Sequence, residues 1–121
     1  MSGGGPRRFR LTGTGVFAAL FRTGSRHEGV WLQVVAAPAR SLPGRVGFVI
    51  GKKALRNAVA RNRVRRVLRV AVHDARPGAE AFDVILRLKR GCTRDETAAV
   101  AAEARALLSA LVADEALGEP R

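Results

Sequence analysis

Residues 57–73 read NAVARNRVRRVLRVAVH, and this basic stretch decides the fold of the chain. Asn57 is a good N-cap residue, and the apolar spacing after it predicts a helix from about residue 58 to about residue 73. One side of that helix is apolar and is expected to pack inward, through Ala60, Val64, Val67, Leu68 and Ala71. The opposite side carries Asn62, Arg65, Arg66, Arg69 and His73, with Arg61 and Arg63 at its margins.

The segments on both sides of this helix predict a small sheet. Residues 29–37 and 46–50 are rich in β-branched and aromatic side chains and are separated by turn residues, so we expect them to form an antiparallel hairpin. Trp31 is expected in the middle of the first of these strands, as a core anchor. A third strand is expected at residues 82–88.

Two further helices complete the prediction. Helical spacing of apolar residues predicts a short helix over residues 14–22, which Gly24 ends, and Thr93 and Glu96 form a capping box before a closing amphipathic helix. The order helix, two strands, helix, strand, helix predicts an α+β fold, a two-layer sandwich. We expect a single domain over residues 1–121, with a flexible leader at 1–9 and a flexible tail at 114–121.

The charge of the chain is strongly uneven. Of the first 73 residues, fifteen are Lys or Arg and only Glu28 is acidic, and the whole chain carries a net charge of +12. No acidic residue lies between Lys52 and His73, so neighbouring arginines repel one another unless an anion covers them. This pattern favours a polyanionic partner over a merely solvated surface. The planar fork of arginine, which binds two phosphate oxygens or stacks on a base, favours RNA.

The composition argues against several other classes of protein. The apolar runs are too short to span a bilayer and no secretory signal is visible, so we expect a cytoplasmic protein. Cys92 is the only cysteine, and His27 and His73 lie far apart, so metal binding by the protein alone is not expected. A stand-alone nuclease would need clustered carboxylates or a histidine pair, and the basic region offers only His27 and Glu28. A structural RNA-binding module, such as a ribosomal or assembly protein, stays open as the alternative.

The basic residues follow a fixed spacing, Lys52-Lys53-x4-Ala58-x2-Arg61-Asn62-Arg63-x-Arg65-Arg66-x2-Arg69. This pattern resembles the signature of the bacterial ribonuclease P protein component. The resemblance extends over roughly 100 residues, from Arg10-Leu11, Phe17, Phe21 and Gly24, through Arg45-Val46-Gly47-Phe48, to the strand that opens at Asp83. The Arg-Asn-Arg signature favours this family over a general structural module.

The resemblance implies a small mixed β-sheet packed by three helices, with a left-handed β-α-β crossover around the basic helix, as in the second domain of a small-subunit ribosomal protein. It also implies a subunit of a ribonucleoprotein endonuclease that removes the 5′ leader from precursor tRNA. In that family the RNA subunit holds the active site and its Mg²⁺ ions, so we expect no catalytic residues in the protein, no membrane contact and no obligate protein partner. The residues that the resemblance places on RNA are Lys52, Lys53, Arg56, Arg61, Asn62, Arg63, Arg65, Arg66 and Arg69.

The resemblance further implies a cleft between the sheet and the first helix that takes the single-stranded leader. The matching residues are Arg10, Phe17, Phe21 and Arg45. By their spacing alone, Phe17 and Phe21 are explained equally well as core residues. Many family members carry a strand tyrosine that faces the leader, whereas this chain has no tyrosine and offers Val34 and Val35 in the matching region.

Overall fold

The computed structural model describes residues 14–118 of the chain, and the side chains of residues 19–114. The sequence predicts six of the elements in this part, but neither β1 nor η1. In chain order the elements are α2 (Thr14–Thr23), β1 (Ser25–Glu28), β2 (Leu32–Pro38), β3 (Val46–Val49), α3 (Ala58–Asp74), the 3-10 helix η1 (Gly78–Ala81), β4 (Phe82–Leu88) and α4 (Thr97–Gly118).

The four described strands form one mixed sheet in the order β1-β2-β4-β3. β2 pairs antiparallel with β1 and with β4, whereas β3 pairs parallel with β4. The predicted antiparallel hairpin between residues 29–37 and 46–50 is therefore wrong, because β4 lies between these two strands. β4 takes the centre because it is apolar on both faces: Val84 and Leu86 lie in one buried cluster, and Ile85 lies in the other.

The connection from β2 to β3 crosses the beginning of β4. The Ala39 N–H donates to the Ala81 carbonyl, and the Gly44 N–H donates to the Glu80 carbonyl at 2.7 Å. A Cβ atom at Gly44 would overlap the backbone carbonyl of Phe82, so this close passage requires glycine. The turn residues predicted between these two strands therefore do connect them, but the connection spans one intervening strand.

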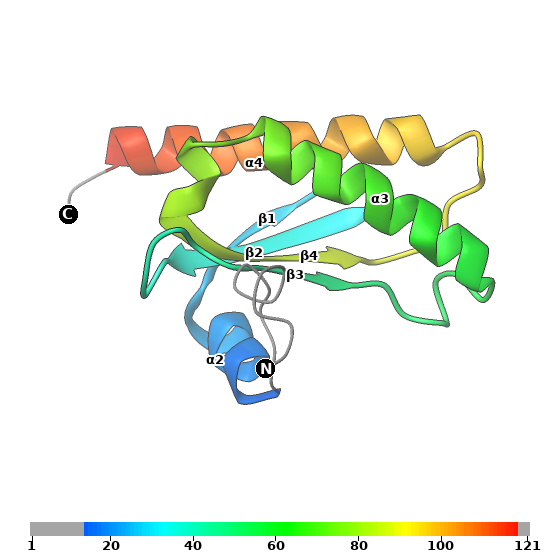
Figure 1. Ribbon diagram of the computed structural model, residues 1–121, viewed down its shortest axis with the longest axis horizontal. Coiled ribbons are helices and arrows are strands. Elements are labelled where there is room, and N and C mark those ends of the chain that lie inside the picture. Colours follow the sequence, from blue (N-terminus) through cyan, green and yellow to red (C-terminus); the bar gives the residue numbers. More distant parts are fainter. Residues whose placement is uncertain (1–13, 119–121) are drawn as a thin grey trace, which may run out of the picture.

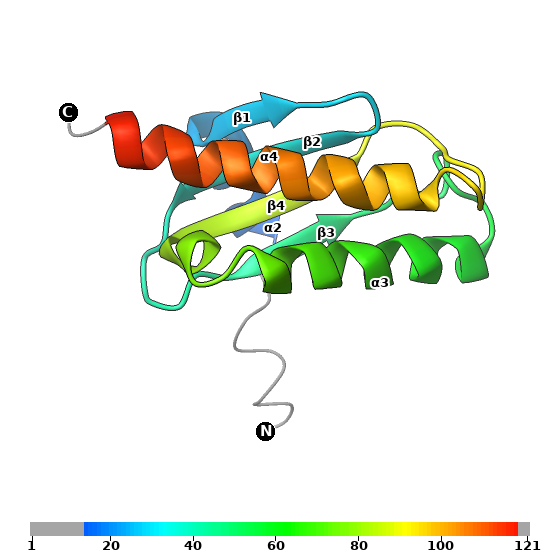
Figure 2. The ribbon, with the colours of Figure 1, turned by 90° about the horizontal axis from the view of Figure 1, so that it is seen from above.

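The parallel strands β3 and β4 are joined by a left-handed crossover, as the resemblance implies. In Figure 2 both strands run in the same direction behind α3, and the path from β3 through α3 to β4 turns opposite to the usual right-handed connection. General sequence rules alone would have favoured the right-handed form.

Helices cover the sheet on both faces. Figure 1 shows α3 and α4 on one face and the short α2 on the other. The larger core lies between the sheet and the two long helices, and its members include Leu32, Val34, Val64, Leu68, Leu86 and Leu108. A smaller cluster of Leu20, Val35 and Ile85, with Phe21 packed against it, joins α2 to the opposite face. The predicted α+β sandwich of a small mixed sheet and three helices is confirmed.

Local capping signals set the ends of the helices. The Asn57 side chain accepts hydrogen bonds from the N–H groups of Val59 and Ala60, and this cap starts α3. Before α4, the Thr93 N–H donates to the Glu96 carboxylate while the Glu96 N–H donates to the Thr93 hydroxyl, which is the predicted capping box. α4 continues to Gly118, past residue 114 where we predict the tail to begin, and the flexibility of that tail stays a prediction.

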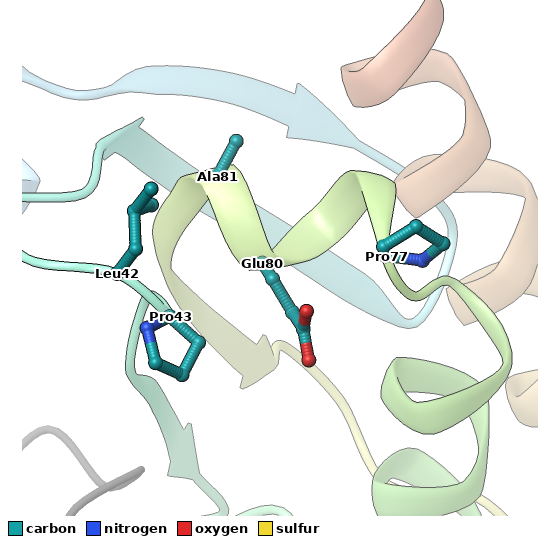
Figure 3. Close-up of a pocket in the computed structure, with 5 residues that line it drawn as sticks. All are labelled: Leu42, Pro43, Pro77, Glu80 and Ala81. Atoms are coloured by element: carbon teal, nitrogen blue, oxygen red, sulfur yellow. The ribbon is translucent and has the colours of Figure 1, made fainter.

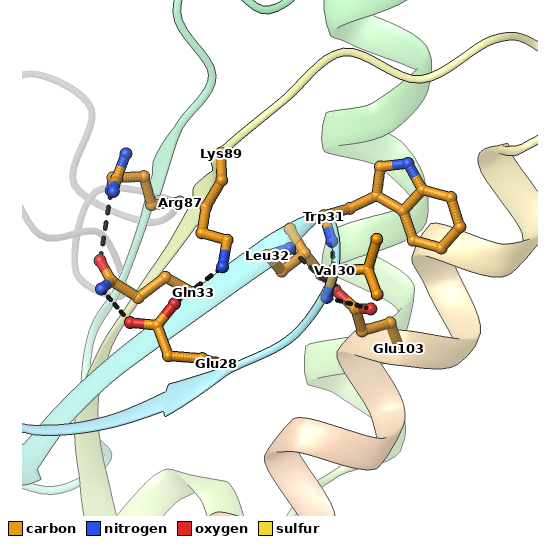
Figure 4. Close-up of polar contacts among 8 residues, drawn as sticks. All are labelled: Glu28, Val30, Trp31, Leu32, Gln33, Arg87, Lys89 and Glu103. Atoms are coloured by element: carbon orange, nitrogen blue, oxygen red, sulfur yellow. Dashed lines mark hydrogen bonds and ion pairs between the residues drawn. The ribbon is translucent and has the colours of Figure 1, made fainter.

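A single carboxylate fastens α4 to the turn between β1 and β2. Glu103 Oε1 accepts a hydrogen bond from the Val30 N–H at 2.8 Å, and its Oε2 accepts from the Trp31 and Leu32 N–H groups at 2.9 and 2.8 Å (Figure 4). A Cβ atom at Gly29 would overlap this carboxylate. Trp31 lies in the turn before β2 and packs against the edge of the larger core, so its predicted mid-strand position is wrong.

Candidate nucleic-acid interface

The outer side of α3 and the loop before it form a continuous basic surface. Val64, Leu68 and Ala71 of α3 are buried, as predicted, which turns the cationic side of the helix outward. Lys52, Lys53, Arg56, Asn62, Arg66 and Arg69 are exposed, whereas Arg61, Arg63 and Arg65 are half-buried. Within residues 19–114 none of these cations makes an ion pair with a carboxylate. The surface therefore keeps its charge for an external anion.

Arg61 points back toward the protein. Its Nη1 donates to the carbonyl oxygens of Leu55 and Arg56, both at 2.8 Å, and so braces the basic loop against the first turn of α3. The sequence places Arg61 at the margin of the basic side, but spacing alone does not reveal these two carbonyls. Contact between Arg61 and RNA stays a prediction, whereas its brace on the loop is a structural role that sequence reasoning missed.

A second side-chain contact orders the middle of the basic side. Arg65 Nη1 donates to Asn62 Oδ1 at 3.0 Å, and within residues 19–114 the amide nitrogen of Asn62 has no acceptor, so it is a free donor there. Because the pair is one helical turn apart, it holds both side chains along the axis of α3.

Two basic loops lie side by side at one end of the molecule. A Cβ atom at Gly91 would overlap the Ala54 carbonyl, so the loop at residues 89–96 approaches the loop at residues 51–57 closely at this one point. This brings the exposed side chains of Arg90 and Arg94 to the same end as Lys52 and Lys53. No local sequence pattern predicts that these loops are neighbours, because they are far apart along the chain.

Cys92 belongs to the second of these loops, at residues 89–96. Its side chain is half-buried and packs against the larger cluster. Burial raises the pKa of its thiol, and the nearby Glu96 carboxylate raises it further, while Arg63 acts in the opposite direction. The thiol is therefore held neutral, as expected of a packing residue rather than a nucleophile.

The sheet face beneath α2 carries the predicted leader residues that can be described. Phe21 is half-buried against Val35 and Ile85. By strand alternation Arg45 belongs to the same face, where its guanidinium lies 3.7 Å from the carboxylate of buried Asp83. Arg10 and the side chain of Phe17 lie outside the described residues.

Val34 and Val35, which lie in the region where the resemblance implies a leader-facing tyrosine, are both fully buried. Val34 lies in the larger core and Val35 beneath α2. Neither side chain is therefore available to contact a leader.

A polar chain of four side chains occupies the other end of that face (Figure 4). Lys89 Nζ donates to Glu28 Oε1 at 2.9 Å, Gln33 Nε2 donates to Glu28 Oε2 at 2.6 Å, and Arg87 Nε donates to Gln33 Oε1 at 3.2 Å. The Lys89 ammonium and the Gln33 amide hold the pKa of the Glu28 carboxyl below its usual value. Glu28 thus forms an ion pair with Lys89, whereas Arg87 makes no ion pair with a carboxylate within residues 19–114.

Comparison with known proteins assigns the family. The Ribonuclease P family profile matches residues 6–112. The ribonuclease P protein component of Chromobacterium violaceum is 31% identical over 105 residues, which cover 87% of each chain. That of Chromohalobacter salexigens is 38% identical over 89 residues, 73% of this chain and 70% of the relative.

The chain belongs to the ribonuclease P protein family. The solved structure of the Staphylococcus aureus RNase P protein is similar in fold, with a TM-score of 0.66 at 18% identity, over 87% of this chain and 93% of that one. In this ribonuclease P protein, the fold brings together the predicted RNA-binding residues from the loop at 51–57 and from α3. Arg45 and Phe21 lie on the other face of the sheet.

A pocket of this ribonuclease P protein lies apart from both surfaces. It is open and mostly apolar, and it is lined by Leu42, Pro43, Pro77, Glu80 and Ala81, where the β2–β3 connection meets η1 (Figure 3). The described residues contain no group of three or more His, Cys, Asp or Glu side chains that could hold a metal ion. Within the same residues, no helix is both long and apolar enough to cross a membrane.

Proposed function

We propose that this chain is the protein subunit of a bacterial ribonuclease P that binds the catalytic RNA and the 5′ leader of precursor tRNA, and so promotes removal of the leader. The observation that carries the proposal is the basic surface formed by the outer side of α3 and the loop at residues 51–57, which we call the α3 surface. Its cations have no carboxylate partners within residues 19–114. The RNA subunit supplies the active site and its Mg²⁺ ions, and the holoenzyme works in the cytoplasm.

The two faces of the sheet support separate roles for the two RNA partners. The α3 surface is rigid, because its helix is capped at Asn57 and its loop is braced by Arg61. Such a surface suits a structured RNA, whose phosphates are fixed in space. The face beneath α2 presents Phe21 and Arg45, an aromatic ring and a cation, which suit a single strand.

Reconstitution tests the proposal. The chain is mixed with a bacterial ribonuclease P RNA at low Mg²⁺, and leader removal from precursor tRNA is measured. We expect cleavage with both components and none with the protein alone. Cleavage by the protein alone would refute the assignment of catalysis to RNA. RNA binding without any gain in leader removal would favour the structural RNA-binding module instead.

Salt titration tests which surface binds. If about six phosphates are engaged, the logarithm of the assembly constant should fall with the logarithm of salt concentration with a slope of about −4 or steeper. A flat titration would show that the α3 surface is not the contact.

Replacement of aromatic residues tests the leader contact. Phe17→Leu with Phe21→Leu should weaken binding of precursor tRNA far more than binding of mature tRNA. Equal losses for both tRNAs would assign these residues to the core.

A further inference from the structure

Two large apolar side chains stand exposed on the most basic helix of the molecule. Val59 is 66% exposed and Val70 is 52% exposed. Single exposed apolar residues are common on protein surfaces and need no explanation. These two, however, share one line along α3 with Asn62, Arg66 and His73, because the spacing 59, 62, 66, 70, 73 follows one ridge of an α-helix. We call these five residues the outer ridge.

The outer ridge faces directly away from the core. The buried residues of α3 are Val64, Leu68 and Ala71, on the opposite side of the helix. With a rise of about 1.5 Å per residue, Val59 and Val70 lie roughly 16 Å apart along the axis. The outer ridge thus has an apolar side chain toward each end and polar or cationic side chains between them.

The charge around the outer ridge indicates which kind of partner could pack against its valines. Asp74, at the very end of α3, is the only acidic residue of the helix. The valines are also small, whereas membrane-binding helices use larger apolar wedges. Structured RNA fits both properties: its shallow minor groove shows sugar carbons, 2′-hydroxyl groups and base edges between two lines of phosphate.

Resting on the proposed function, we propose that the outer ridge packs against the sugar and base surface of the structured RNA subunit, with Val59 and Val70 making apolar contacts at its two ends. Arg66 reaches phosphate between them, and the free amide donor of Asn62 reaches a hydroxyl or base edge. The binding of RNA by α3 then has two separable parts. One comes from phosphate contacts and falls with salt, and the other comes from the valines and does not.

The two parts can be measured separately in the assembled holoenzyme. Affinity for a bacterial ribonuclease P RNA is titrated against salt for the natural chain, for the double variant Val59→Thr with Val70→Thr, and for Arg66→Ala. Each threonine exchanges a methyl group for a hydroxyl, which costs about fourfold in affinity at a buried contact, so the double variant should bind roughly tenfold or more weakly. Its salt slope should equal that of the natural chain, whereas Arg66→Ala should make the slope shallower by about 0.7 to 0.9.

The chain supplies a matched control. Val30 is 57% exposed but lies in the turn before β2, away from α3, and Val30→Thr should leave both affinity and slope unchanged. A second double variant, Val59→Ala with Val70→Ala, keeps high helix propensity and should weaken binding at least as much as the threonine pair. Thermal unfolding of each free variant verifies that the fold is intact.

Two outcomes would overturn the inference. The first is a double variant that binds the RNA within twofold of the natural chain. The second is a salt slope that changes when only the valines are replaced. Either result would show that the valines make no apolar contact with the RNA. Both outcomes leave the proposed function standing if the natural chain still restores leader removal. Failure of the natural chain to do so is a different result, and it would sink the proposed function itself.

Discussion

Replacement of Glu103 should unfasten α4 from the sheet. Its carboxylate accepts hydrogen bonds from three backbone N–H groups at 2.8 to 2.9 Å. These three hydrogen bonds join α4 to the turn before β2. In Glu103→Ala all three donors lose their partner. Val30 is exposed and its N–H regains water, whereas Trp31 is half-buried and Leu32 is fully buried.

The size of the effect follows from the number of donors left without a partner. Hydrogen bonds to a charged group contribute about 1.5 to 3 kcal/mol each, and partial hydration reduces this, so Glu103→Ala should lower the free energy of unfolding by about 3 kcal/mol. In Glu103→Gln, one amide oxygen can still accept from Trp31 and Leu32, but the amide nitrogen then faces the Val30 N–H. The expected loss is about 1 to 1.5 kcal/mol.

Urea and thermal unfolding of the free protein measure both variants. At about 4 °C per kcal/mol for a domain of this size, the midpoint should fall by about 12 °C for Glu103→Ala and by about 5 °C for Glu103→Gln. Arg105→Ala, at an exposed position of the same helix, is the control and should change stability by less than about 0.5 kcal/mol. An alanine variant as stable as the control would refute the reasoning.

Three further predictions follow from single contacts. Arg61→Ala should speed hydrogen exchange of the amides in residues 51–57 of the free protein, while Arg66→Ala should not; equal exchange in both variants would contradict the brace. The pKa of Glu28 is lowered in the folded state from its ordinary value of 4.5. The pairing of Glu28 with Lys89 therefore stabilises the fold fully at pH values above 4.5. This contribution is lost as the pH falls through the lowered pKa. Glu28→Gln should therefore lie below the natural chain in stability at neutral pH, with a gap that closes in acid. Because its pKa is raised, the Cys92 thiol should react with iodoacetamide at pH 8 more slowly than free cysteine, and an equal rate would contradict its burial.

The sequence predicts most of the local structure because local signals determine it. The bounds of α3 follow from the Asn57 cap and from a regular apolar spacing, and the capping box at Thr93 and Glu96 announces α4. β1 gave no such signal, since Ser25–Glu28 has no apolar alternation and forms a strand only by pairing with the edge of β2. The predicted pairing of β2 with β3 is wrong for a related reason: β4, which pairs with β2 instead, begins 50 residues after β2 begins, and no local pattern identifies it.

The sequence likewise predicts one part of the candidate site, and only the fold shows the rest. The helical period places the arginines of α3 on the outer side without any structure. Only the fold shows that Arg61 turns inward to two carbonyl groups, that Arg90 comes to lie beside the lysine loop, and that Val34 and Val35 are buried. These facts depend on contacts between segments that are distant in sequence.

The backbone contact at Gly91 has a consequence for how this domain can change in evolution. Since the Ala54 carbonyl lies where a Cβ atom at Gly91 would stand, an insertion beside either residue would push the segments 51–57 and 89–96 apart. We therefore expect homologous chains to lengthen or shorten both segments in concert, with glycine retained wherever they meet. An RNA that orders one of these segments would then lower the entropic cost of ordering the other.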